Sequence, residues 1–137
     1  MNEVVKTAFN AAMMEARSAY RSGDYDACFQ QLKRAHILGQ RHLVRHWVSH
    51  WWMLKVGLKM RDRREIFGQL VRLLAVVPGF LVGWVPIGNT GAADVSALRP
   101  MPLPNDLSRT IGDISLTRDV FLRVALLVVI FLLLVIM

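Results

Sequence analysis

Cysteine is nearly absent from this sequence. Cys28 is the only one in 137 residues, so the chain cannot form an internal disulfide and contains no CxxC metal or redox motif. A lone cysteine is typical of a small buried side chain in a reducing compartment. A secretory signal is also lacking, because the first residues, Met-Asn-Glu-Val-Val-Lys, do not form a basic segment followed by an uninterrupted apolar core. We therefore expect the globular part of the chain to lie in the cytoplasm.

Recognised catalytic motifs are missing as well. The sequence has no Gly-x-Ser-x-Gly elbow, no glycine-rich phosphate loop ending in lysine, no His-Glu-x-x-His and no Cys/His cluster at zinc spacing. Glu15, Asp62 and Glu65 are more typical of solvated helix faces or caps than of general acid/base pairs. Gly88-Asn89-Thr90-Gly91 could bind an anion through its backbone, but it is more typical of an ordinary turn. Catalysis by this chain alone is not expected, and no small-molecule substrate is indicated.

One long apolar run is present, and it closes the sequence. Val120 to Met137 is apolar apart from Arg123, and Val124 to Met137 has no polar side chain. As a helix the longer run would measure about 27 Å, close to the ~30 Å hydrocarbon core of a bilayer. We predict a single membrane anchor over residues 117–137, in which Arg123 reaches toward the headgroups and the apolar contacts include Val120, Val124, Phe131 and Met137. The alternative, a helix buried in a soluble core, is disfavoured because so short a chain cannot easily surround it.

Positive charge is concentrated in one part of the chain. Between Lys33 and Arg72 there are ten lysines and arginines against two acidic residues, whereas the whole chain has a net charge of +7. Basic residues on the N-terminal side of the anchor fit the positive-inside rule and are attracted to anionic lipid. The expected location is a membrane, with the head on the cytoplasmic side and the lipid bilayer as a partner. Nucleic acid is the competing partner, but no nucleic-acid-binding motif accompanies the charge.

The apolar periodicity of residues 1–91 predicts an all-α head domain. Apolar residues recur at helical spacing over four segments, which are residues 3–20, 25–38, 41–60 and 62–77. Gly23 suits a left-handed helix end, while Asp24 and Asp62 can cap the helices that follow them. The predicted fold is two antiparallel helical hairpins, the first resembling a tetratricopeptide repeat, plus a C-terminal transmembrane helix.

The region between these helices and the anchor contains all five prolines of the chain. Pro78-Gly79 and Gly83 interrupt the apolar stretch of residues 73–85, which favours a kinked hairpin, packed or interfacial, over a spanning helix. Residues 88–104 are expected to form a loop, and the prolines at 100, 102 and 104 favour an extended strap within residues 92–116. Residues 105–115 are expected to be a linker, with Thr117 as a candidate cap of the anchor.

Histidine provides the one constellation that could carry chemistry. His42, His46 and His50 recur every four residues, so each step turns about 400° and the three imidazoles share one face of a helix. Met53 continues this band, and nitrogen with soft sulfur donors suits copper, zinc or nickel. Three histidines along one helix rarely reach one ion, because the outer pair is about 12 Å apart. Completing a site would need His36, Glu15, Cys28 or a second chain.

A structural role for these histidines is the alternative. They would then form the polar edge of an amphipathic helix whose adjacent face, with Trp47 and Trp51, packs in the core. Two other tryptophans, Trp52 and Trp84, are candidate anchors in the membrane interface. The candidate partner-binding residues are Trp52, Trp84, Asn89 and Thr90.

Several segments, taken together, resemble a known family. They are Arg34-Ala35-His36-Ile37-Leu38-Gly39-Gln40, His50-Trp51-Trp52-Met53-Leu54, Pro86-Ile87-Gly88-Asn89-Thr90-Gly91, Val95-Ser96-Ala97 and Pro100-Met101-Pro102. Through them, residues 5 to 106 resemble the bacterial family called domain of unknown function 3703. The resemblance implies a helical bacterial domain and no particular activity, and the apolar tail lies beyond it.

These observations lead to three functional hypotheses. The first is a membrane-anchored accessory or assembly subunit that binds a membrane protein partner at the cytoplasmic face. The second is a protein that binds or handles a transition metal through His42, His46, His50 and Met53. The third is a subunit that completes the active site of a membrane enzyme without being catalytic by itself.

Overall fold

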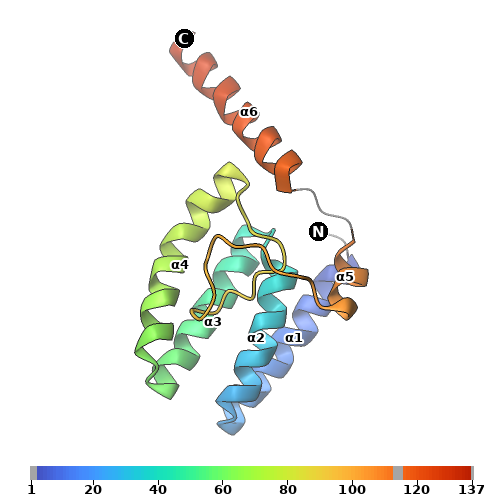
Figure 1. Ribbon diagram of the computed structural model, residues 1–137, viewed down its shortest axis with the longest axis vertical. Helices are drawn as coiled ribbons and strands as arrows, with labels where there is room; N and C mark the ends of the chain where they lie inside the picture. The colour runs from blue at the N-terminus through green and yellow to red at the C-terminus, as the bar shows by residue number, and fades with distance from the viewer. Residues whose placement is uncertain (1–2, 113–115, 137) are drawn as a thin grey trace.

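The computed structural model describes residues 3–112 and 116–136, which form six helices and contain no strand. The helices are α1 (Glu3–Ser22), α2 (Tyr25–Gly39), α3 (Leu43–Met60), α4 (Arg63–Val82), α5 (Asn105–Ile111) and α6 (Leu116–Ile136). The first four pack side by side in chain order, and α6 projects from one end of this bundle (Figure 1). The all-α prediction is therefore confirmed for the described residues.

The short connections between the first four helices follow the local signals in the sequence. Gly23 adopts φ +81° after α1, and the Asp24 carboxylate accepts a hydrogen bond from Ala27 N at 3.0 Å. Asp62 caps α4 in the same way, accepting from Glu65 N at 3.0 Å. Both carboxylates satisfy amides that the first turn of a helix leaves unpaired. The capping roles predicted for these residues are confirmed.

The fourth helix extends beyond its predicted end. α4 passes through Pro78 and ends at Val82, where Gly83 takes φ +76°, so the kinked hairpin predicted for residues 73–85 is wrong. An internal proline costs a helix about 3 kcal/mol because one hydrogen bond is lost and the ring crowds the preceding turn. Contacts on both sides of Pro78 offset this cost, since Val76 is buried and Phe80 packs under the Arg123 guanidinium.

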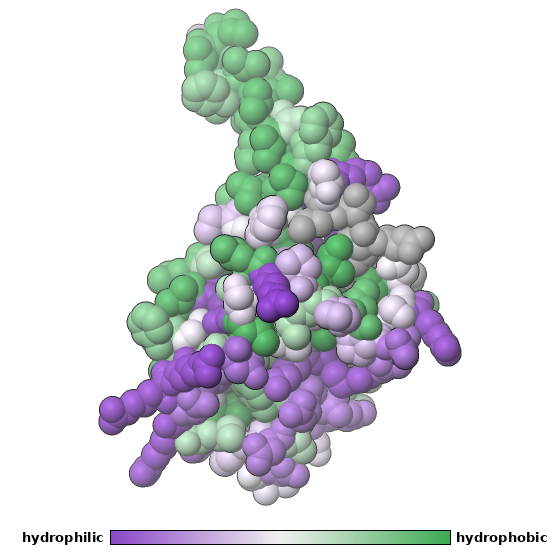
Figure 2. All heavy atoms as spheres, in the orientation of Figure 1, coloured by the Kyte–Doolittle hydropathy of each residue, from purple (hydrophilic) through white to green (hydrophobic). Residues whose placement is uncertain are grey.

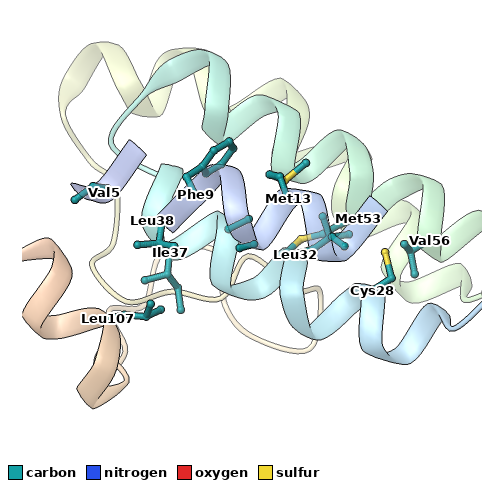
Figure 3. Close-up of a cluster of buried hydrophobic side chains, with 13 residues drawn as sticks. Val5, Phe9, Met13, Cys28, Leu32, Ile37, Leu38, Met53, Val56 and Leu107 are labelled. Atoms are coloured by element: carbon teal, nitrogen blue, oxygen red, sulfur yellow. The ribbon is translucent and has the colours of Figure 1, made fainter. Parts of the chain in front are cut away.

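The core lies where α1, α2 and α3 meet (Figure 3). Leu32 and Cys28 of α2 are fully buried, as are Met53 and Val56 of α3. Small residues such as Ala16 and Ala35 are also fully buried, which lets the helix backbones approach closely. Burying a large aliphatic side chain contributes roughly 1.5–3 kcal/mol, so this cluster is the main source of stability in the bundle.

The tryptophans of α3 are oriented opposite to the prediction. Trp47 and Trp51, expected in the core, are each 40% exposed and stack on each other with centroids 5.7 Å apart. Trp52 points inward instead, in edge contact with Tyr20 at 5.5 Å and beneath the Arg17 and Lys55 cations. The helical face was misjudged because tryptophans at positions 47, 51 and 52 fit an apolar stripe in more than one register.

After α4 the chain returns across the bundle as a long loop and then forms α5. The loop is closed by Met101 N donating to Ile87 O at 2.9 Å. The linker predicted for residues 105–115 is wrong over its first part, because α5 occupies Asn105–Ile111. Leu107 is buried against the core and Asp106 pairs with Arg34 of α2. These long-range contacts explain why a short helix forms where the local sequence does not predict one.

Apolar side chains gather at the end of the molecule from which α6 projects, whereas the opposite end is polar (Figure 2). The outer face of α4 is also apolar, and Leu74 is 80% exposed. By length and composition α4 could cross a membrane, and Val120–Ile136 forms a shorter apolar helical segment. α6 begins at Leu116, which places Thr117 within the helix, and Met137 lies outside the described residues.

The first prediction concerns the glycine that lets the loop close. A Cβ on Gly88 would lie 2.1 Å from the Met101 carbonyl oxygen, and the residue has φ +72°. We expect Gly88→Ala to lower the free energy of unfolding by about 2–4 kcal/mol through backbone strain plus overlap, measured by urea denaturation. Gly23→Ala is the matched control, because Gly23 also has positive φ but nothing within 4 Å, and about 1 kcal/mol is expected. Equal losses would contradict the steric explanation.

Candidate metal centre

Three histidines from two helices converge on one point inside the bundle. His36 lies in the last turn of α2, while His46 and His50 are one turn apart on α3. The Nε2 atom of His50 is 3.0 Å from that of His46 and 3.2 Å from that of His36. One ring nitrogen of each residue lies within 4.8 Å of the other two. The packing of α2 on α3 therefore assembles a group that neither helix could form alone.

The structure uses part of the predicted histidine band. His46 and His50 of that band belong to the group, together with His36, one of the residues considered for completing a site. His42 stands immediately before the first turn of α3, and its side chain is outside the group. Met53 is buried near it, but its sulfur lies 3.6 Å from Gln69 Nε2. The imidazoles are thus the candidate ligands. Met53 contacts Gln69, the residue whose side chain bonds to His50.

Hydrogen bonds fix the tautomers of two of these imidazoles. His36 Nδ1 lies 2.8 Å from the Asn89 carbonyl oxygen, which can only accept, so Nδ1 carries the proton. His50 Nδ1 lies 2.7 Å from Gln69 Oε1. The amide of Gln69 is oriented by its nitrogen, which donates to the Gly91 carbonyl and to the Glu65 carboxylate. Neutral His36 and His50 must therefore each present an unprotonated Nε2 to the centre of the group.

This arrangement places lone pairs opposite one another. The contact between His36 Nε2 and His50 Nε2, at 3.2 Å, has no proton to bridge it when both Nδ1 atoms are protonated. Two facing lone pairs repel, and an electrophile between them removes the repulsion. Tetrahedral zinc with bonds of 2.0–2.1 Å to nitrogen requires nitrogens roughly 3.3 Å apart. The observed 3.0 and 3.2 Å separations are close to that spacing.

The site keeps its histidines neutral. Burial lowers the pKa of His36 well below its ordinary value, and the neighbouring imidazoles lower it further. Burial likewise lowers the pKa of His46 to about 4 and that of His50 to about 3. Neutral imidazole is the form that binds a metal, so no proton has to be displaced at pH 7. His46 Nδ1 is buried with no hydrogen-bond partner among the described residues.

The loop after α4 is shaped by Asn89 and Gly91 and covers the histidines. Asn89 is only 2% exposed, and its side-chain nitrogen donates to the Ser96 and Arg99 carbonyls at 2.8 Å each. Its oxygen accepts from Gly91 N at 2.9 Å. Gly91 has φ +78°, and a Cβ there would lie 2.5 Å from the His36 ring. The side chain of Asn89 is therefore bonded within the loop on both its nitrogen and its oxygen. Thr90 beside it is half-buried.

Two charged residues on the inner face of α4 hold the same loop. Glu65 accepts from Ala93 N at 2.9 Å and, through its other oxygen, from Gln69. Arg72 donates to the Ala92 and Val95 carbonyls at 3.0 and 2.7 Å. Hydrogen bonds of charged groups are stronger than neutral ones, so α4 fixes the backbone that in turn orients His36. The Arg72 side chain is 9% exposed, and its Nε has no partner among the described residues.

A cavity of about 390 Å³ lies above the three histidines. Its floor contains His36, His46 and His50 together with Asn89 and Arg72, and its walls are apolar. The walls come from the second half of α4 and from the loop, and they include Val76, Phe80, Trp84, Val85 and Leu98. A bound metal would therefore have three protein ligands and a fourth direction that faces this space.

A family model matches residues 3–111 of the chain. The chain belongs to DUF3703, a family of proteins of unknown function. No curated protein and no solved structure is similar enough to count as a match. The matched range contains all three histidines, Gln69 and the covering loop, whereas α6 lies outside it. The three-histidine group therefore lies within the part of this chain that the family model matches.

Sequence reasoning missed most of the residues that support this DUF3703 site. Gln69, Glu65 and Arg72 were not singled out for it, although they recur at spacings of four and three on one face of α4. Buried polar residues in such a band would have been a usable signal, because polar side chains are rarely buried without a partner. The contribution of Asn89 through its backbone carbonyl could not be found in the sequence.

The low pKa values of the histidines predict how stability depends on pH. An imidazole whose pKa is lower in the folded than in the unfolded chain binds fewer protons when folded, so folding is favoured above about pH 6.5. This contribution is lost as the pH falls toward the folded pKa values of about 4 for His46 and 3 for His50. We expect the free energy of unfolding of the metal-free chain to fall steadily from pH 7 to pH 4.5, measured by urea denaturation with chelator present.

Substitutions can assign this pH dependence to the buried cluster. His50→Gln should reduce the fall in the free energy of unfolding between pH 7 and pH 4.5 more than His42→Gln does. The reason is that His42 is only partly buried and lies outside the group. A pH dependence that is unchanged in His50→Gln would contradict the assignment.

Proposed function

We propose that this protein binds one transition-metal ion through the Nε2 atoms of His36, His46 and His50. The observation that carries this proposal is the convergence of the three Nε2 atoms while two of the Nδ1 atoms are held by oxygen acceptors. Metal-binding histidines characteristically donate their other ring N–H to a carboxylate, a backbone carbonyl or water, which fixes the ring and raises its basicity. Asn89 and Gln69 supply that support here.

The donor set narrows the choice of metal. Imidazole nitrogen suits zinc, copper, iron and nickel. The Met53 sulfur accepts from Gln69 Nε2 at 3.6 Å, and Met53 does not line the cavity above the histidines. Catalytic zinc sites have three protein ligands and one open coordination position, whereas structural zinc sites are closed by four protein ligands. We favour zinc or copper, held in a site that can exchange its ion or bind a further molecule. The earlier hypothesis of metal handling thus takes His36 in place of His42.

Metal titration tests this proposal directly. We expect the chain to bind one Zn²⁺ or Co²⁺ per molecule, with the cobalt absorption bands of a four-coordinate site. His36→Ala, His46→Ala and His50→Ala should each weaken binding on the order of 100-fold or more, since even a supporting partner is worth 10–100-fold. His42→Ala is the matched control and should bind within about twofold of the unchanged chain. Equal losses for His42→Ala and His46→Ala would overturn the proposed ligand set.

We also propose that α6 anchors the domain in a membrane, as a single transmembrane helix at the cytoplasmic face of a bacterial inner membrane. Support comes from its side chains, because Val124 and every residue from Leu126 to Ile136 are at least 40% exposed. Exposed apolar surface of this extent is rare on soluble monomers. Arg123 donates to the Phe80 carbonyl and covers the Phe80 ring at 4.1 Å, so the anchor would join the head at the end of α4.

An accessory role is the second candidate function. The exposed apolar face of α4, with Phe67, Leu70 and Leu74, favours docking against a membrane protein partner. A tetratricopeptide-like arrangement of α1 and α2 would offer a further docking surface, and the metal could then complete a site shared with that partner. Trp84 is exposed beside α6 and remains a candidate contact, whereas Trp52 is half-buried against Tyr20.

Membrane fractionation tests the anchor. We expect the intact chain to remain with membranes in alkaline carbonate and a chain ending at Thr117 to be released, because about 20 apolar residues are needed to hold a segment across a bilayer. Leu74→Asp is the control for the competing apolar helix α4 and should stay attached. Retention of the shortened chain would contradict anchoring by α6, and a purely monomeric chain in a mild-detergent extract would contradict the accessory role.

A further inference from the structure

We propose that the cavity above the three histidines binds an amphipathic carboxylate, with its head group at the metal and Arg72 and its alkyl chain along the apolar walls. This inference rests on the proposed metal site, because the metal would supply both a ligand position and part of the positive charge. It extends that function from holding an ion to recognising a class of small molecule.

The charge of the cavity floor favours an anion. Arg72 is the one charged residue among the described residues that line the cavity. Glu65 does not line it, and its two carboxylate oxygens are engaged by Gln69 and by Ala93 N. The three histidine ligands are neutral, so a divalent ion would add two positive charges without an anionic ligand. Burying net charge is costly unless it is paired, and an anionic head group would provide that pairing.

The hydrogen bonds of Arg72 leave its Nε unused. Its terminal nitrogens donate to the carbonyls of Gly68, Ala92 and Val95, whereas Nε is buried with no partner among the described residues. A buried donor without a partner destabilises the fold, and more so when it is charged. A carboxylate has two oxygens, so one could bind the metal while the other accepts from Nε.

The walls determine what the rest of the ligand must be. At about 390 Å³, the cavity falls within the 300–1,000 Å³ range of small-molecule sites. Val76, Phe80, Trp84 and Leu98 offer no charge and, apart from the indole N–H, no polar side-chain group. A hydrophilic anion such as acetate would leave this surface unfilled, whereas an alkyl chain would cover it. The complementary molecule is therefore charged at one end and apolar along its length.

The position of the cavity suggests where such a molecule would enter. Trp84 lines the cavity and also a second hollow formed with α6 residues Val120, Phe121 and Val124. The second hollow adjoins α6, which projects from the apolar end of the molecule (Figure 2). Trp84 and Leu98 are exposed, so an amphipathic carboxylate dissolved in lipid would meet the cavity beside the anchor helix. A medium-chain fatty acid has this chemistry.

Binding of decanoate to the cobalt-loaded intact chain in phosphatidylcholine nanodiscs tests the proposal. Decanoate should change the cobalt absorption bands and bind at least tenfold more tightly than acetate, decanol or decyltrimethylammonium. Ala75→Phe, which fills the cavity from α4, should weaken decanoate binding at least tenfold while cobalt and acetate binding stay within threefold. Leu74→Phe is the matched control, because Leu74 is the adjacent residue but does not line the cavity, and it should behave like the unchanged chain.

The outcomes separate this inference from the metal proposal. If the chain binds no cobalt, the metal site itself is wrong and the carboxylate site falls with it. If cobalt binds but decanoate binds no more tightly than acetate, the apolar cavity does not hold the alkyl chain. In that case the carboxylate inference is overturned and the metal proposal is not. If decanol binds as tightly as decanoate, or if Ala75→Phe leaves decanoate binding unchanged, the head group or the location is wrong.

Discussion

The hydrogen bonds from His36 Nδ1 to the Asn89 carbonyl and from His50 Nδ1 to Gln69 hold the centre of this molecule together. Each one joins elements that are far apart in the sequence: α2 to the covering loop, and α3 to α4. They also decide which nitrogen of each ring is left for a ligand, because a donated Nδ1–H forces Nε2 to be the free base. Structure and chemistry are thus set by the same two contacts. A buried cluster of neutral imidazoles without these acceptors would have no defined tautomer, and nothing would turn the Nε2 lone pairs of His36 and His50 toward each other.

The covering loop depends on polar groups that α4 carries inward. Glu65, Gln69 and Arg72 each bond to backbone groups between Gly91 and Val95, which replaces the backbone partners that a loop lacks when it leaves solvent. The course of α4 through Pro78 also shapes the site. Because α4 continues through it to Val82, Phe80 becomes a cavity wall and also meets Arg123 of α6. Had the helix ended at Val77, as the proline suggested, the cavity would have lost this wall and α6 its contact with the head.

Local patterns in the sequence predicted the helices and two members of the site. His46 and His50 could be placed on one face because a helix repeats every 3.6 residues, and the caps at Asp24 and Asp62 follow from residue type and position. His36 could only be considered, because its approach depends on how α2 packs on α3. The Asn89 carbonyl carries no side-chain signal at all. The errors have the same origin, since α5 and the inward turn of Trp52 are fixed by contacts with Arg34 and Tyr20 that lie far away in the sequence.

The location of the core bears on what the histidine group is for. The buried apolar side chains around Leu32, Met53 and Val56 pack on one another, so the energy gained by burying them does not itself require an ion. A small domain that needs zinc to fold places its ligands at the core and closes the site with four of them. Here three neutral ligands lie beneath an apolar cavity, and an ion would stabilise the fold only through its own binding equilibrium. If the fold does not need the ion, the ion and its fourth ligand are free to exchange, as the proposed binding and handling of a metal would require.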